Sequence, residues 1–247
     1  MLRRLSAIAL AAFCATAAVA DDAPLSRADV ETIVRDYLLA NPEVLEEAFT
    51  VLQTRRQEQE AAARVAVLET QRDELVASPH DGVLGNPDGD VTLVEFFDYN
   101  CGYCRRAMTD LEALLESDPN LRVVLKEFPV LGQPSMEAAA VSISVQALHP
   151  EAYGEFHHRL MAADGPADGE AALKIAEALD LPREALEANM RSEHVRSVME
   201  KSYEVAQALG LSGTPSYVVG DAVEFGAVGA DQLRARINEA RCGAVTC

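Results

Sequence analysis

The stretch VTLVEFFDYNCGYC, residues 91–104, decides the fold of this chain. Its first seven residues are mostly apolar and predict a buried strand. A Cys-x-x-Cys pair follows, and it opens an amphipathic stretch that continues to Glu116. A cysteine pair at a strand-to-helix junction is the layout of a thiol–disulfide redox site. We therefore expect a strand over 91–97 and a helix that begins at the cysteine pair.

The two cysteines of this motif have different expected roles. Cys101 lies where the helix begins, and the backbone N–H groups and helix dipole there favour a thiolate. It is the predicted nucleophile, because a thiolate is the species that attacks disulfides. Cys104, one helical turn later, is the predicted resolving thiol. Half of a four-cysteine zinc site is the alternative, but the strand-then-helix setting disfavours it, so no metal site is predicted.

Glu95 is an acid in an otherwise apolar strand, on the same face as Leu93 and Phe97. A carboxyl group that is buried has a raised pKa and can exchange protons with a nearby thiol. A solvent-facing strand residue is the alternative reading. The apolar neighbours on both faces favour the buried one.

The first residues of the chain indicate export. Residues 1–20 contain Arg3 and Arg4, an apolar run and an Ala-x-Ala cleavage pattern, which predict a cleaved signal peptide and an exported protein. Cys14 lies within this leader and is expected to have no role. The chain has five cysteines, so cleavage leaves an even number. Cys242 and Cys247 are predicted to form a structural disulfide in an oxidising compartment.

Residues 26–77 are expected to be helical almost throughout, with Ser26 and Asp29 as a capping pair and a break at Asn41-Pro42. The apolar stripe of such helices needs a partner. We therefore predict a helical oligomerisation arm over 21–78. An arm that packs on its own domain, or a loose helical linker, remains the alternative.

Residues 79–247 are expected to form one compact α/β domain. A break is predicted over 78–82 and a turn over 85–89, both rich in Gly, Pro and Asp. Further strands are predicted over 121–128, 217–219 and 223–225, and a closing helix over 231–241. Residues 134–210 read as a helical insertion broken near 149–150, 165–166 and 181–182.

The formal net charge of −19 argues against nucleic acid or anionic membrane surfaces as partners. No pattern indicates a cofactor, and no stretch after the leader predicts membrane insertion. His157 and His158 are expected on the surface or in a groove, without a ligand role.

Taken together, Glu95, the Cys101–Cys104 motif, Gly213-Thr214-Pro215 and the helical insertion resemble the thioredoxin-fold DsbA family of bacterial thiol–disulfide proteins. The run 91–104 and the arm around Asn41-Pro42 are most similar to its ScsC branch, the suppressors of copper sensitivity. The resemblance implies a cis peptide at Pro215, a reactive Cys101 and a proton-relay role for Glu95. It also implies assembly into a trimer or dimer through residues 26–77.

Within that superfamily, the spacer Gly102-Tyr103 and Thr214 before the proline resemble the disulfide isomerase DsbC rather than the oxidase DsbA. Spacer residues tune the stability of the thiolate and hence the redox poise. The resemblance implies an isomerase or reductase that acts on unfolded or misoxidised secreted proteins. A membrane thiol reductase of the DsbD type would keep it reduced. A DsbA-like dithiol oxidase and a copper-binding protein that uses Cys101 and Cys104 remain alternatives.

Overall fold

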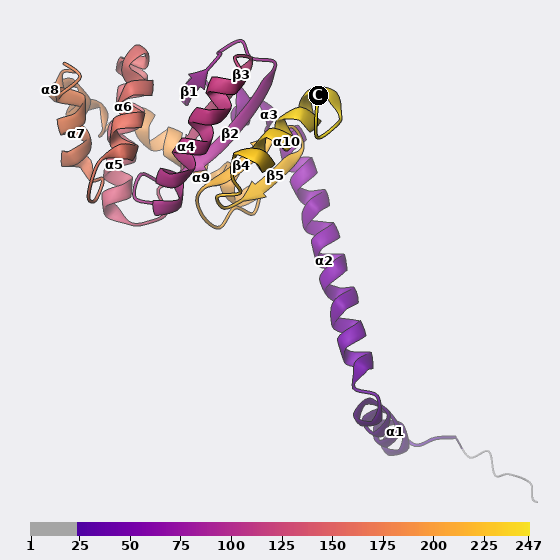
Figure 1. Ribbon diagram of the computed structural model, residues 1–247. Helices are drawn as coiled ribbons and strands as arrows, with labels where there is room; N and C mark the ends of the chain where they lie inside the picture. Colours follow the sequence, from indigo (N-terminus) through magenta and orange to yellow (C-terminus); the bar gives the residue numbers. More distant parts are fainter. Residues whose placement is uncertain (1–23) are drawn as a thin grey trace, which may run out of the picture. The chain divides into compact units, whose positions relative to one another are not determined.

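The computed structural model describes residues 24–247 (Figure 1). The predicted leader over 1–20 and Cys14 lie outside these residues. The chain divides into two compact units that meet between Arg55 and Arg56.

The first unit contains helix α1, Arg27–Ala40, and the beginning of helix α2, Glu43–Thr70. The predicted capping pair is confirmed: the Asp29 N–H donates to Ser26 Oγ, and the Ser26 N–H donates to the Asp29 carboxylate at 3.0 Å. The break at Asn41-Pro42 is also present, because Asn41 is the C-cap of α1. The cap satisfies backbone groups that a helix end otherwise leaves unpaired.

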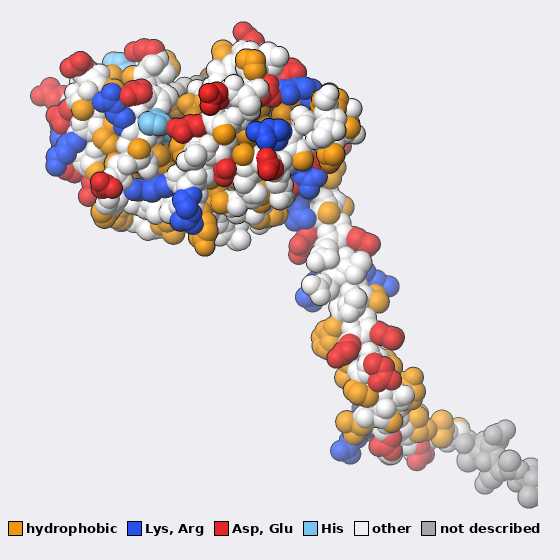
Figure 2. Space-filling view, in the orientation of Figure 1, with side chains coloured by type: hydrophobic (Ala, Val, Ile, Leu, Met, Phe, Trp, Pro, Cys, Tyr) orange, Lys and Arg blue, Asp and Glu red, His pale blue; other side chains and the backbone are white. Residues whose placement is uncertain are grey.

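This unit leaves its large apolar side chains in solvent (Figure 2). None of the residues of α1 is buried, and the one buried residue of α2 lies beyond this unit. Monomeric proteins rarely expose contiguous apolar surface on this scale. The exposed residues of this unit are Leu25, Val30, Ile33, Val34, Tyr37, Leu39, Leu45, Phe49, Val51 and Leu52.

The second unit is built on a five-stranded sheet in the order β1-β3-β2-β4-β5. Strands β2 and β3 run parallel, and the other neighbours pair antiparallel. Strand β2 is central and buried along its length, as the apolar run predicts. The strands are β1 Gly82–Gly85, β2 Val91–Phe97, β3 Leu121–Glu127, β4 Ser216–Val219 and β5 Ala222–Phe225.

Helices cover both faces of this sheet. Alternation along β2 sends Leu93 and Phe97 to the face that packs against α4, Gly102–Ser117, and α10, Ala230–Cys242. Val94 and Phe96 point to the other face, which packs against α3, Arg72–Val76, and α9, Glu193–Ala208.

The helical insertion lies between β3 and β4. It consists of α5 Gln133–Leu148, α6 Pro150–Ala162, α7 Gly169–Glu177, α8 Arg183–Asn189 and α9. The three predicted breaks are confirmed, and a fourth separates α8 from α9 at residues 190–192. The mixed sheet with this insertion is a thioredoxin-like fold of the DsbA type.

The sequence missed strand β1, which lies between the break and the turn predicted there. The strand has only four residues, begins and ends in glycine, and shows no alternation. The first glycine of the strand is required for packing, because a Cβ on Gly82 would lie 1.9 Å from the Tyr153 ring. A strand of this composition can be recognised only in the folded structure, where it pairs with the edge of β3.

The boundary between the units also differs from the expected 78/79. Helix α2 ends at Thr70, and α3 follows as a separate short helix. Leu68 and Leu75 are buried in the same apolar cluster as Val94 and Phe96. The last part of the expected arm is therefore core of the second unit.

Candidate active site

Cys101 is the N-cap of α4, at the carboxyl end of β2. It is 7% exposed, whereas Cys104, in the first turn, is 1% exposed. Both are free thiols. The chain reaches this position in a tight turn, in which the Cys101 N–H donates to the carbonyl of Asp98 at 3.0 Å. Only the first sulfur therefore faces an approach from solvent.

The surroundings shift the pKa values of the two thiols in opposite directions. Hydrogen bonds from the Cys104 thiol, the Thr214 side chain and the N–H groups of Cys104 and Tyr103 lower the pKa of Cys101 to about 5, although partial burial opposes this. The same pairing, burial and the nearby Glu95 raise the pKa of Cys104. Near neutral pH the arrangement holds one thiolate and one thiol.

The Thr214-Pro215 peptide bond is cis, and it lies directly against the cysteine. In its thiol form Cys101 donates from Sγ to the carbonyl oxygen of Thr214 at 3.2 Å. Residues 113 positions apart in the chain thus meet at one sulfur.

Glu95 is 1% exposed, and one of its carboxylate oxygens has no hydrogen-bond partner among the described residues. Burial raises its pKa to about 8, opposed by a hydrogen bond from Tyr217 and reinforced by the charge of Cys101. A carboxyl group of this kind exchanges its proton near neutral pH.

Tyr217 is a site residue that the sequence reading missed. It pairs directly with Glu95 across β2 and β4, and its side chain is 1% exposed. Directly paired residues of neighbouring strands share one face of the sheet. The available signal was its place two residues after the Thr214-Pro215 pair, but the register that sets it opposite Glu95 is not visible in the chain.

The spacer residues lie at the surface. Tyr103 is 61% exposed, and the Arg106 guanidinium stacks over its ring at 4.4 Å from the centroid. Gly102 has open space where a Cβ would stand, apart from an Arg106 nitrogen at 3.8 Å. The outer rim of the site is therefore an aromatic side chain with a cation on it.

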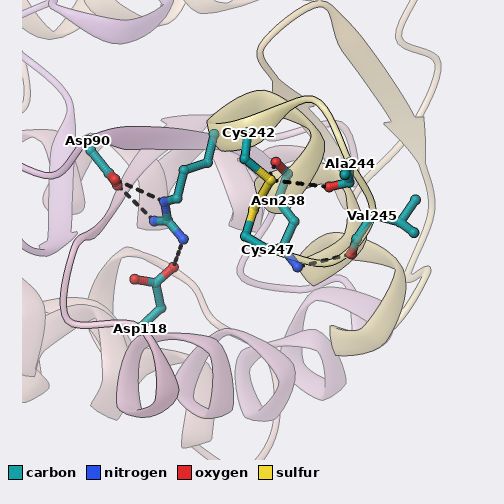
Figure 3. The surroundings of a disulfide bond; sticks show 8 residues. Asp90, Asp118, Asn238, Cys242, Ala244, Val245 and Cys247 are labelled. Atoms are coloured by element: carbon teal, nitrogen blue, oxygen red, sulfur yellow. Dashed lines mark hydrogen bonds and ion pairs between the residues drawn. A yellow bond between two sulfur atoms is a disulfide. The ribbon is translucent and has the colours of Figure 1, made fainter.

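The other cysteine pair lies far from this site. Cys242 and Cys247 form a disulfide just beyond the end of α10 (Figure 3). The adjacent Arg241 contacts Asp90, which precedes β2, and Asp118, the C-cap of α4. Cys101 lies at the opposite end of both elements, so the four cysteines cannot share one metal ion.

A second cluster of buried polar side chains includes Tyr99 of the cysteine loop. His157 was expected at the surface or in a groove, but it is fully buried, and burial lowers its pKa to about 3. Its Nδ1 lies 3.0 Å from the hydroxyl of Tyr99, which also contacts Ser142 Oγ at 2.8 Å. The expectation was wrong because helix α6 packs this face into the core, whereas its neighbour His158 remains exposed.

Within residues 24–247, no group of three His, Cys, Asp or Glu side chains is arranged to hold a metal ion. In the same part of the chain, no helix combines the length and the apolar composition needed to cross a membrane.

Two protein families match this chain. Residues 92–238 match the DSBA-like thioredoxin domain, which is more than half of the chain. Residues 27–59 match the copper resistance protein ScsC N-terminal domain. The first match contains the cysteine pair and the cis-proline, and the second contains the exposed apolar helices.

Solved structures show the same relationship. A thioredoxin-like oxidoreductase from Silicibacter pomeroyi DSS-3 is 44% identical, with a TM-score of 0.66, over 69% of this chain and 97% of that one. A Proteus mirabilis ScsC variant with a linker deletion is 29% identical, with a TM-score of 0.68, over 91% of this chain and all of that one.

A curated relative of a different kind is the Na(+)/H(+) antiporter NhaA 1 from Salinispora arenicola, 26% identical over 163 residues. The match covers 66% of this chain and 25% of the antiporter, so the chain spans about a quarter of that protein's length.

Proposed function

Since this chain belongs to the family of DSBA-like thioredoxin domains, we propose that it is a protein thiol–disulfide oxidoreductase that acts mainly as an isomerase and reductase. The observation that carries the proposal is the placement of Cys101 at the N-cap of α4 beside the Thr214 carbonyl, with Cys104 buried one helical turn behind it. Cys101 is the nucleophile and Cys104 is the resolving thiol.

The chemistry begins when the Cys101 thiolate attacks a substrate disulfide. That disulfide breaks, a Cys101–substrate disulfide forms, and the other substrate sulfur leaves as a thiolate. In isomerisation a substrate thiolate then attacks the intermediate, so Cys101 is released unchanged. In reduction Cys104 attacks the Cys101 sulfur, so the substrate takes two electrons and the Cys101–Cys104 disulfide remains.

Glu95 is the proposed acceptor of the Cys104 proton in the reductive branch. Its charge raises the pKa of Cys104, which shows that the two groups interact electrostatically. A pKa of about 8 suits a group that takes up a proton and releases it again near neutral pH.

Thr214 and Pro215 are proposed to contribute to substrate binding beside Cys101. The contact between the Thr214 carbonyl and Cys101 Sγ supports this role, because a disulfide that Cys101 attacks has to approach the same sulfur. An extended substrate can pair with backbone at this edge. Gly102 and Tyr103 are proposed to tune the thiolate and form the rim.

Three further assignments belong to the proposal. The exposed apolar side chains of α1 and α2 support assembly into a homo-oligomer, a trimer or dimer, because such surfaces need a partner. Export through a cleaved leader over 1–20 would put the protein in the periplasm. There it would act on unfolded or misoxidised proteins and be reduced by a membrane thiol reductase of the DsbD type.

The Cys242–Cys247 disulfide is proposed as a structural clip. It holds residues 243–247 against the last turn of α10, where Asn238 Nδ2 also donates to the carbonyl of Val245 at 3.0 Å. It lies beside the Arg241 ion pairs and away from Cys101.

The deciding experiment is reactivation of a disulfide-scrambled test protein by the reduced chain, 21–247. We expect recovery of its activity with the wild type and none with Cys101→Ser. A variant Cys104→Ser should accumulate the mixed disulfide. Recovery with Cys101→Ser at the wild-type rate would refute the mechanism.

Two other functions have an observation in their favour. A low thiolate pKa also suits a dithiol oxidase, since stabilising the reduced form makes the disulfide a stronger oxidant. Rapid oxidation of a reduced substrate without reactivation would favour it. The match to a copper resistance domain favours Cu(I) binding by the Cys101–Cys104 thiols, and a tight stoichiometry lost in Cys101→Ser would support this.

A further inference from the structure

The loop that carries Cys101 is held by the helical insertion rather than by its own sheet alone. Three side chains of this loop and of the first turn of α4 bind the insertion: Asp98, Asn100 and Arg105. Their partners lie in two places, the start of α5 with its preceding loop and the loop between α6 and α7. We refer to these three residues as the loop clasp.

Asp98 binds the first of these places. It is almost fully buried, and its Oδ2 accepts from the Leu131 N–H at 2.9 Å. Its Oδ1 accepts from Ser135 Oγ at 2.7 Å and from the Asn100 N–H at 2.8 Å. The backbone carbonyl of the same residue accepts from the Cys101 N–H. One residue thus joins the cysteine directly to the beginning of α5.

Asn100 and Arg105 bind the second place, and Asn100 Nδ2 also donates to Ser135 Oγ in the first place at 3.0 Å. Asn100 donates from Nδ2 to the carbonyl of Ala167 at 2.7 Å and accepts at Oδ1 from the N–H of the same residue at 2.8 Å. Arg105 donates to the carbonyls of Ala163 and Gly165 at 2.5 and 3.0 Å. Its Nε also donates to the carbonyl of Tyr99 inside the cysteine loop at 2.8 Å.

We propose that the helical insertion sets the reactivity of Cys101 through this clasp, with Asp98, Asn100 and Arg105 as positioning residues. The inference rests on the proposed exchange chemistry at Cys101. None of the three side chains contacts a sulfur in this structure; they act on the loop and on the helix start that orient one.

The physical reason is the short range of the bonds that stabilise the thiolate. The thiolate of Cys101 is favoured by hydrogen bonds from the Cys104 thiol, from the Thr214 side chain and from N–H groups of the first helical turn. Hydrogen bonds weaken steeply once donor and acceptor separate beyond their normal range or lose alignment. A loop released from the insertion moves the sulfur off these donors, while the helix and the sheet stay intact.

The test compares clasp variants with cap variants of the same insertion. Asn100→Ala removes the bonds to Ala167 and Ser135. Arg105→Lys removes the fork that reaches Ala163 and Gly165 but keeps the positive charge. The controls are Asp168→Ala and Ser192→Ala, which remove the N-cap bonds of α7 and α9. Removing such a cap typically costs about 1 kcal/mol of stability.

The readout is the rate of Cys101 alkylation as a function of pH in the reduced chain 21–247, with thermal unfolding of each variant measured in parallel. The wild type should show a midpoint near pH 5. Asn100→Ala and Arg105→Lys should raise it by about one unit, a tenfold loss of thiolate below the midpoint. The cap variants should lower the melting temperature and leave the midpoint in place.

Unchanged midpoints in both clasp variants would overturn the inference, as would an equal shift in the cap variants. If Asn100→Ala does not fold, Arg105→Lys alone decides, because it retains its charge and its aliphatic stem. A wild-type midpoint at the ordinary cysteine value of about 8.5 would instead overturn the proposed thiolate chemistry itself. The two failures are therefore distinguishable.

Discussion

At the scale of residues, the site depends on unequal surroundings for chemically similar groups. Cys101 and Cys104 are three positions apart, yet their pKa values move in opposite directions. The first caps a helix and remains 7% exposed, and the second is enclosed beside a buried acid. Such a separation of the two pKa values leaves one thiolate that attacks the substrate and one thiol that reacts afterwards.

Glu95→Gln should stabilise the reduced protein in a pH-dependent way. Between about pH 4.5 and 8 the folded state keeps the Glu95 proton that the unfolded chain has lost, so stability falls as the pH rises through this window. Glutamine does not titrate, so this loss of stability with rising pH disappears in the variant. The free energy of unfolding should rise by about 3 kcal/mol at pH 7.5 relative to the change at pH 4.5.

Urea unfolding at these two pH values measures this effect. Any cost of burying the amide is the same at both pH values and cancels in the comparison. An equal change in stability at pH 4.5 and pH 7.5 would show that Glu95 does not carry a raised pKa.

Tyr217→Phe should raise the pKa of Glu95 above its value of about 8, because the hydroxyl group bonds to the charged form of the acid. A carboxyl-carbon NMR titration of Glu95 measures it. Tyr153→Phe is the matched control, since this tyrosine is also buried but belongs to helix α6. A midpoint that stays in place or falls would exclude the proposed pairing.

At the scale of elements, the short helix α3 belongs to the core although it has only five residues. Too short to be stable alone, it is held by burying Leu75, which is 1% exposed, in the cluster beneath β2. Its neighbour Lys126, on β3, is buried beside Asp81 at 2.6 Å and beside Glu74 of α3 at 3.6 Å. These contacts hold α3 against β3 within the second unit.

Leu75→Ala should therefore lower the free energy of unfolding by about 2–5 kcal/mol, the usual cost of a cavity at a buried leucine. Val65→Ala in α2 is the control, because Val65 is exposed. Urea unfolding of the chain 56–247 compares them without the first unit. A loss no larger at Leu75 than at Val65 would mean that α3 is not part of the core.

At the scale of the whole molecule, the place of the unit boundary decides how the arm can be removed. A deletion of 21–55 leaves every residue of the three buried apolar clusters in place. A deletion of 21–78 removes Leu68 and Leu75 and uncovers Val94 and Phe96. The two truncations separate loss of assembly from loss of the fold.

The chain 56–247 should be a folded monomer with more oxidase character, and the chain 79–247 should unfold or aggregate. Light scattering gives the mass of each, and urea unfolding gives its stability. A mass of 56–247 that remains a multiple of the monomer would refute the assignment of assembly to the arm.

Much of the architecture was readable from local pattern. Their own residues predict three parts of the fold: strand β2, the helix at the cysteine pair and the insertion. Each shows a regular spacing of apolar residues or is bounded by Gly and Pro breaks. Strand β1 carries neither, because its four residues owe their conformation to the edge of β3. His157 was misplaced for a related reason, since the burial of a helix face depends on what packs against it.

The sequence by itself determined the cysteine motif, the order of the elements and the apolar stripe of the arm, because these depend on neighbours within a few residues. Only the tertiary structure decided that Tyr217 faces Glu95, that Leu68 and Leu75 belong to the core, and that the insertion binds the cysteine loop. Those contacts join residues far apart in the chain. They follow from strand register and helix packing, which are set when the whole apolar surface is buried at once.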